Sequence, residues 1–126
     1  MEFINDAPGA PKPVGAYSQA VEHGGFVFLA GQVGIDPSTG QLVAGGIEAE
    51  TKQVLENLRA VLAASETSPA QILMTTIFLA DINDAKTVNG FYAEFVNKDH
   101  PPARQTVSVK ALPLGALVEI SVIAAV

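Results

Sequence analysis

The end of the chain alternates between apolar and mixed positions, the pattern of a β-strand with two different faces. Val118 and every second residue after it are apolar, which predicts a face buried beneath other elements. The positions between them include Glu119 and Ser121, so the opposite face is mixed. We therefore expect a strand over Leu117–Val126 that other elements of the chain cover on one side only.

The segment Arg104–Lys110 alternates as well. Two valines, Val107 and Val109, share one face. The other face carries the polar side chains of Arg104, Thr106, Ser108 and Lys110. A loop containing Pro113 and Gly115 joins this segment to the last strand. An antiparallel pairing through this loop would place Ser108 near Glu119 and Arg104 about 13 Å further along. A long reach of the arginine side chain, or a neighbouring subunit that supplies one of the two residues, would then bring Arg104 and Glu119 together.

Earlier segments supply the remaining strands, among them a hairpin. Phe26–Ala30 is aromatic and β-branched, follows the pair Gly24-Gly25 and precedes the turn cluster Asp36–Gly40, which is typical of a hairpin. Ile72–Leu79 is a longer run of the same character.

Two segments have helical periodicity. Between Ile47 and Ala64 apolar residues recur every three or four positions, with Glu48 and Lys52 paired four apart on the other side. A second helix follows the candidate caps around Asp81 and must end before the proline pair at 101. Its apolar stripe consists of Val88, Phe91, Tyr92 and Phe95.

This order predicts one α+β domain over residues 1–126, with two helices against a sheet of five or six strands. Two helices cover only one face of such a sheet. The mixed face is too apolar to be left in water, yet it carries charges that a monomer core would not hold unpaired. We therefore expect an oligomer with a site in the subunit interface.

The composition of the chain argues against several classes of function. Hydrophobic residues make up 48% of the chain and the net charge is −6, with the basic residues scattered singly, so we expect neither a nucleic-acid partner nor a membrane partner. Cysteine is absent and the two histidines, His23 and His100, stand apart, so we expect no metal site. A secretory signal and a membrane span are also missing, and we expect a cytoplasmic protein.

Two residues stand out as candidates for chemistry. Arg104 begins a predicted strand directly after Pro101-Pro102-Ala103, and its planar guanidinium suits a carboxylate ligand. Glu119 is embedded in a strongly apolar run, and such a carboxylate is a candidate general base that holds and deprotonates a water. A structural ion pair in the interface explains the same two residues about equally well.

Other candidates carry less information. Tyr17 lies in a predicted loop, where a tyrosine either offers its hydroxyl to a ligand or packs against neighbouring residues. Gly31 and Gly34 lack a phosphate-binding pattern and suit a bulge, a turn or a backbone N–H that faces a ligand. The serines have no His–Asp partners, so serine hydrolysis is not expected.

Several short segments of the chain are specific enough to compare with known families. The most specific are Pro101-Pro-Ala-Arg104 and Leu117-Val-Glu-Ile120. The others are Gly15-Ala-Tyr-Ser-Gln19, Ala30-Gly-Gln-Val33, Asp36-Pro-Ser-Thr-Gly40, Asn57-Leu58, Asp81-Ile-Asn-Asp84 and Val88-Asn89. With these segments the chain resembles, over nearly its whole length, the RidA family, also known as YjgF or L-PSP proteins.

The resemblance implies a chorismate-mutase-like α+β fold and a homotrimer with a central barrel, helices outside and three clefts between subunits. It also implies hydrolysis of reactive imines, such as 2-iminobutanoate and 2-iminopropanoate, to 2-oxo acids and ammonia without metal or cofactor. By position, Arg104 matches the carboxylate-binding arginine and Glu119 the glutamate that orients water. The matching cleft positions, expected to bind substrate, are Tyr17, Ala30, Gly31, Asn89 and Thr106.

Three positions depart from the family pattern. Thr106 stands where cysteine is frequent, Gln105 where small residues are usual, and Ala30 where serine is common. These changes alter the cleft and leave the choice of imine open. Two rival functions also remain: a non-catalytic trimer that binds small acids or acts as a chaperone, and a translation-inhibiting endoribonuclease, against which the net charge of −6 weighs.

Overall fold

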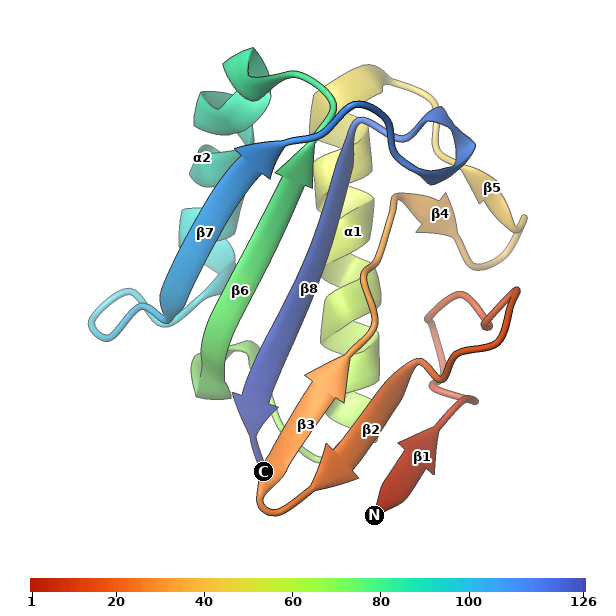
Figure 1. The fold of residues 1–126 in the computed structure, drawn as a ribbon, viewed down its shortest axis with the longest axis vertical. Helices are drawn as coiled ribbons and strands as arrows, with labels where there is room; N and C mark the ends of the chain where they lie inside the picture. Colours follow the sequence, from red (N-terminus) through yellow and green to blue (C-terminus); the bar gives the residue numbers. More distant parts are fainter.

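A computed structural model describes all residues, 1–126, and places the strands in a six-stranded sheet and a separate two-stranded ribbon (Figure 1). The sheet has the order β1-β2-β3-β8-β6-β7. Its strands are β1 (Glu2–Ile4), β2 (Ala20–His23), β3 (Phe26–Leu29), β6 (Ile72–Leu79), β7 (Ala103–Ser108) and β8 (Val118–Ala125). The ribbon pairs β4 (Ile35–Asp36) with β5 (Gln41–Leu42).

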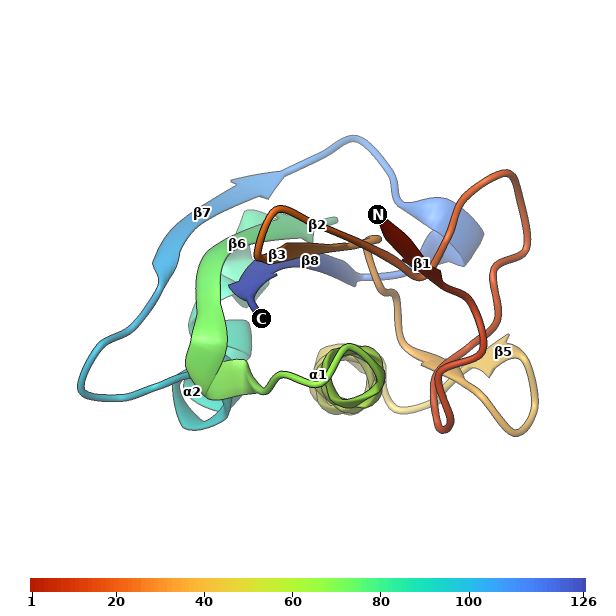
Figure 2. The ribbon, with the colours of Figure 1, turned by 90° about the horizontal axis from the view of Figure 1, so that it is seen from below.

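Two helices, α1 (Gly46–Ala64) and α2 (Ala85–Phe95), pack on one face of the sheet, and Figure 2 shows the other face without a covering layer. The buried side chains of α1 recur at helical spacing, and Val54, Leu58 and Val61 are fully buried. They share one core with the alternate residues of β8 that begin at Val118. This confirms the expected α+β class, two helices on a mixed six-stranded sheet.

The turns form where the sequence supplies flexible residues. Gly24 and Gly25 both have positive φ, 62° and 84°, and join β2 to β3 as the expected hairpin. Short 3-10 turns cover Pro69–Gln71, Ile82–Asp84 and Pro113–Gly115. Neither α1 nor α2 has the length and apolar character needed to cross a lipid bilayer.

The uncovered face of the sheet exposes several large apolar side chains. Phe28 is 45% exposed there, and its neighbour across the sheet on this face is Ile123 of β8. Phe3, Phe26 and Val107 are also large, apolar and exposed. The alternation in β8 therefore correctly predicted one buried face, while the other face keeps hydrophobic side chains that nothing in the chain covers.

The expected pairing of the last two strands is wrong. β6 lies between them, parallel to β7 and antiparallel to β8. The chain reaches β7 from β6 through α2, and a helical crossover returns the chain parallel to the strand it left. Ser108 and Glu119 consequently lie on opposite sides of β6, about two strand spacings or 10 Å apart.

The expected placement of Arg104 and Glu119 on one face is also wrong. Arg104 is level with Thr75 on β6, whereas Glu119 is level with Phe78. Thr75 and Phe78 are three residues apart in one strand, so the two candidates project from opposite faces. Arg104 points to the side that carries α2, and Val107 points to the uncovered side. Alternation along β7 shows which residues share a face but not which face turns to the helices, and the register with β6 puts Arg104 on the face of buried Thr75.

Candidate functional site

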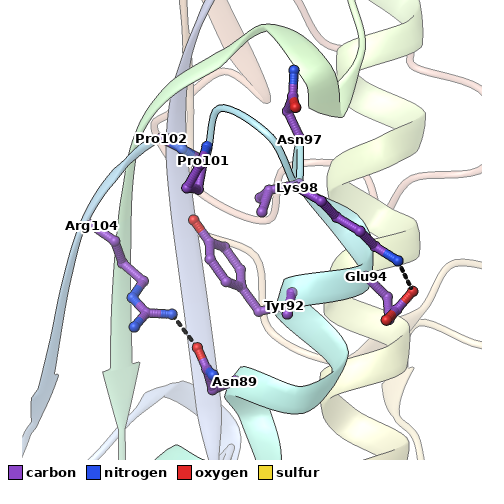
Figure 3. Close-up of a pocket in the computed structure, with 10 residues that line it drawn as sticks. Asn89, Tyr92, Glu94, Asn97, Lys98, Pro101, Pro102 and Arg104 are labelled. Carbon is purple, nitrogen blue, oxygen red and sulfur yellow. Dashed lines mark hydrogen bonds and ion pairs between the residues drawn. The ribbon is translucent and has the colours of Figure 1, made fainter.

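The guanidinium of Arg104 is held by two residues of α2 (Figure 3). Its Nη1 donates a hydrogen bond to Oδ1 of Asn89. Its Cζ lies 5.1 Å from the centre of the Tyr92 ring, the geometry of a cation–π contact. Asn89 and Tyr92 are three residues apart, so both project from one side of the helix toward β7.

The buried hydroxyl of Tyr92 donates to Oγ1 of Thr75 over 2.9 Å. Burial raises the pKa of Tyr92, although the bond with Thr75 and the charge of Arg104 both oppose the rise. The phenol therefore stays protonated and remains a donor at neutral pH.

Arg104 borders two hollows. One, of about 240 Å³, is also lined by Asn89, Thr106 and Lys86. The other, of about 530 Å³, extends past Tyr92 to the proline pair at 101 and to Asn97. The remaining donors of the guanidinium therefore have open space around them, as a carboxylate ligand requires.

Glu119 lies on the other face of the sheet, in a hollow of about 360 Å³. Tyr17, Ala30, Gly31 and Leu114 also line it. Burial raises the pKa of Glu119 above its ordinary value. A carboxylate with a raised pKa is a stronger base than one in water and suits proton transfer near neutral pH.

A β-bulge brings Gly31 against Glu119. Phe28 pairs with Ile123 and Gln32 with Ile120, so three residues of one strand face two of the other. A Cβ on Gly31 would lie 2.8 Å from Oε2 of Glu119, so only glycine leaves room for the carboxylate. The N–H of Gly31 donates to no acceptor in the chain and is free for a ligand. A bulge is one of the three roles that the sequence left open for this glycine.

The structure thus sorts the expected site residues into two groups. Arg104, Asn89 and Thr106 form the arginine half-site, on the side of α2. Tyr17, Ala30, Gly31 and Glu119 form the glutamate half-site, on the uncovered side. Within one chain the two half-sites do not meet.

Sequence reasoning missed two residues beside these half-sites. Tyr92 was expected to be core, and at 4% exposure it is, but it also contacts Arg104. The pattern of the helix shows burial and cannot show this contact. Leu114, 67% exposed beside Glu119, has a φ of 61°, a conformation rarely found for leucine. Its neighbours Pro113 and Gly115 predict a turn, but no signal in the sequence predicts a left-handed leucine.

The structure contains no group of three or more His, Asp or Glu side chains that could hold a metal ion. The chemistry available to the described residues is that of a carboxylate-binding guanidinium and a partly buried carboxylate base.

Fold and half-sites together define a class of protein: a small α+β domain that presents an arginine and a glutamate at opposite faces of one sheet. The sequence model of the Endoribonuclease L-PSP family matches residues 7–126, and the chain belongs to this family, the RidA or YjgF family.

Two relatives and a solved structure illustrate the similarity. A RutC family protein of Pyrococcus horikoshii is 47% identical over 98% of both chains. The 2-iminobutanoate/2-iminopropanoate deaminase of Homo sapiens is 44% identical over 91% of this chain and 83% of its own. The crystal structure of a protein of unknown function of the Rid family, YyfA from Yersinia pestis, has a TM-score of 0.93 and 46% identity over 98% of both chains.

Proposed function

We propose that this protein is a homotrimeric imine deaminase that hydrolyses 2-iminobutanoate, 2-iminopropanoate and similar imines to 2-oxo acids and ammonia. The observation that carries the proposal is the division of the site into two half-sites. Each half-site lacks the reactive group of the other. The glutamate half-site opens on the side of the sheet whose exposed apolar side chains are suited to contact with a second subunit. The human, rat and mouse relatives with that deaminase name, 44 to 46% identical, support it.

In the proposed trimer each cleft combines the arginine half-site of one subunit with the glutamate half-site of its neighbour. The exposed phenylalanines of the sheet would then be buried between subunits, which removes apolar area from water at about 25 cal/mol per Å². An interface of this kind also explains why the hollow around Glu119 is bordered by exposed Tyr17 and Leu114.

The reaction follows from the two groups. Arg104 pairs with the carboxylate of the imine, and the free N–H of Gly31 offers a further hydrogen bond. Glu119 accepts a proton from a water as the water oxygen bonds to the imine carbon. The proton then passes to the nitrogen. As the carbon–nitrogen bond breaks, the hydroxyl of the intermediate gives its proton to the freed Glu119 carboxylate, and ammonia leaves the 2-oxo acid. Orientation and proton transfer suffice, because a protonated imine is already electrophilic.

The test is the decay of 2-iminobutanoate, generated enzymatically, with and without the protein. We expect the wild type to accelerate ammonia release and Arg104→Ala and Glu119→Ala each to abolish the acceleration. Equal rates for all three proteins would rule out the deaminase and leave a non-catalytic trimer that binds small acids or acts as a chaperone.

The family description also names an endoribonuclease. The basic residues do not form a stripe and the net charge is −6, which opposes binding to a phosphate backbone. RNA cleavage that copurifies with the protein and is lost in Glu119→Ala would favour that activity instead.

A further inference from the structure

Tyr92 lies beneath the arginine that the proposed reaction needs, and both its ends are anchored. Its backbone belongs to α2, and its hydroxyl is bonded to Thr75 on β6. Thr75 is fully buried, and its Cα is the register partner of Arg104 itself. Tyr92, Thr75 and Arg104 therefore close a triangle across α2, β6 and β7, and Figure 3 shows the ring turned toward the guanidinium.

The guanidinium needs such support because of its position. Arg104 is exposed and stands on β7, the edge strand of the sheet, so one side of its backbone has no neighbouring strand. A long side chain there would sample many rotamers and lose that freedom on binding a ligand. The Cζ of Arg104 lies over the ring of Tyr92 and its Nη1 is bonded to Asn89, so two contacts hold the guanidinium. The other donors keep a fixed direction.

We propose that Tyr92 is a positioning residue, whose ring preorganises Arg104 for the substrate carboxylate. The inference deepens the proposed function and rests on it. The ring is the part that acts on Arg104, and the hydroxyl serves only to hold the ring against Thr75. Loss of the ring should therefore weaken carboxylate binding, while the chemical step at Glu119 is unchanged.

The chain offers a direct readout and a matched control. Arg59 and Arg104 are its two arginines, so the side-chain Nε–H region of an NMR spectrum contains two arginine signals, which Arg59→Lys assigns. Arg59 lies 5.2 Å from the ring centre of Phe95, also a buried aromatic of α2. Tyr92→Leu should shift the Arg104 signal only, and Phe95→Leu the Arg59 signal only.

Kinetics with 2-iminobutanoate then test the role. We expect Tyr92→Leu to raise KM about tenfold with kcat within about twofold of the wild type. Tyr92→Phe, which keeps the ring, should stay within about twofold in both constants, and Phe95→Leu should leave KM unchanged. If Tyr92→Leu does not fold, Tyr92→Met takes its place in the experiment, because methionine fills the same space without a ring.

Two results would overturn the inference. One is a folded ringless variant whose Arg104 signal moves while KM stays at the wild-type value. The other is an equal rise of KM in Phe95→Leu, which would show a general effect of packing in α2.

Failure of the proposed function can be distinguished from failure of the positioning role. If the wild type does not accelerate hydrolysis, the deaminase proposal fails, and the same variants are compared by NMR titration with 2-oxobutanoate. Weaker binding in Tyr92→Leu alone would support the positioning role. Equal affinities, or no binding by the wild type, would overturn it.

Discussion

The carboxylate of Glu119 lies against Gly31, and glycine is the one residue type without a Cβ that would crowd it. A Cβ on Gly31 would come within 2.8 Å of Oε2 and 2.9 Å of Cδ, so Gly31→Ala must displace the carboxylate. We expect the variant to fold and to lose at least about tenfold in kcat/KM, since small misplacements of catalytic groups cost that much or more. Steady-state kinetics with 2-iminobutanoate and thermal unfolding measure the two effects.

Gly90→Ala is the matched control. A Cβ at Gly90, inside α2, meets no atom within 4 Å, so alanine there should stabilise the helix by about 0.5 to 1 kcal/mol and leave kinetics unchanged. Wild-type kinetics in Gly31→Ala would mean that the position of the Glu119 carboxylate does not limit the reaction.

The raised pKa of Glu119 has a consequence for stability. Burial disfavours the charged form in the folded state, so the folded protein binds this proton more tightly than the unfolded chain. Stability contributed by this group falls as pH rises from the ordinary glutamate pKa to the raised value. Glu119→Gln should therefore unfold at a higher temperature than the wild type at pH 7, with the difference shrinking toward about pH 4.

Thermal unfolding at the two pH values provides the measurement. A lower midpoint for Glu119→Gln at pH 7 would contradict the expectation and would indicate a cation, such as the neighbouring subunit's guanidinium, beside the carboxylate.

At the scale of elements, a hydrogen bond links α1 to the residue just before β8. Glu50 of α1 is 6% exposed, and its Oε1 accepts the backbone N–H of Leu117 over 2.9 Å, two residues before Glu119. Removing the acceptor leaves a partly buried N–H without a partner. Glu50→Ala should lower the free energy of unfolding by about 1 to 3 kcal/mol in chemical denaturation.

Glu50→Gln keeps a side-chain oxygen at the same distance from the backbone and should retain most of the stability. Equal loss in both variants would show that the negative charge matters rather than the acceptor.

For the whole molecule, the division into half-sites predicts complementation between inactive variants. Arg104→Ala keeps an intact glutamate half-site, and Glu119→Ala keeps an intact arginine half-site. If each cleft takes one half-site from each of two neighbouring subunits, random reassembly of an equal mixture restores about one quarter of the clefts.

The experiment is to unfold and refold the two variants together and measure imine hydrolysis, with mass spectrometry to establish that mixed trimers formed. Mixed trimers without activity would show that both groups act from the same subunit or that neither is required for the reaction.

The helices and most strands could be predicted because their signals are local. The helical spacing between Ile47 and Ala64 predicted α1, observed as Gly46–Ala64, and the β-rich run Ile72–Leu79 is β6. The alternation from Val118 predicted the buried face of β8, because a pleat sends successive side chains to opposite sides.

The alternation of apolar and polar residues shows which residues of one strand share a face. It does not show which strand lies beside that strand or which of its faces meets the helices. The structure places β6 between β7 and β8, and the register of β7 with β6 puts Arg104 beside Thr75 on the face that carries α2. These outcomes depend on contacts between distant segments. The sequence by itself thus determined the helices and most strands, the family and the two candidate residues, Arg104 and Glu119. Only the tertiary structure decided that these residues occupy opposite faces of one sheet, because the packing of the helices and the order of the strands are properties of the whole chain.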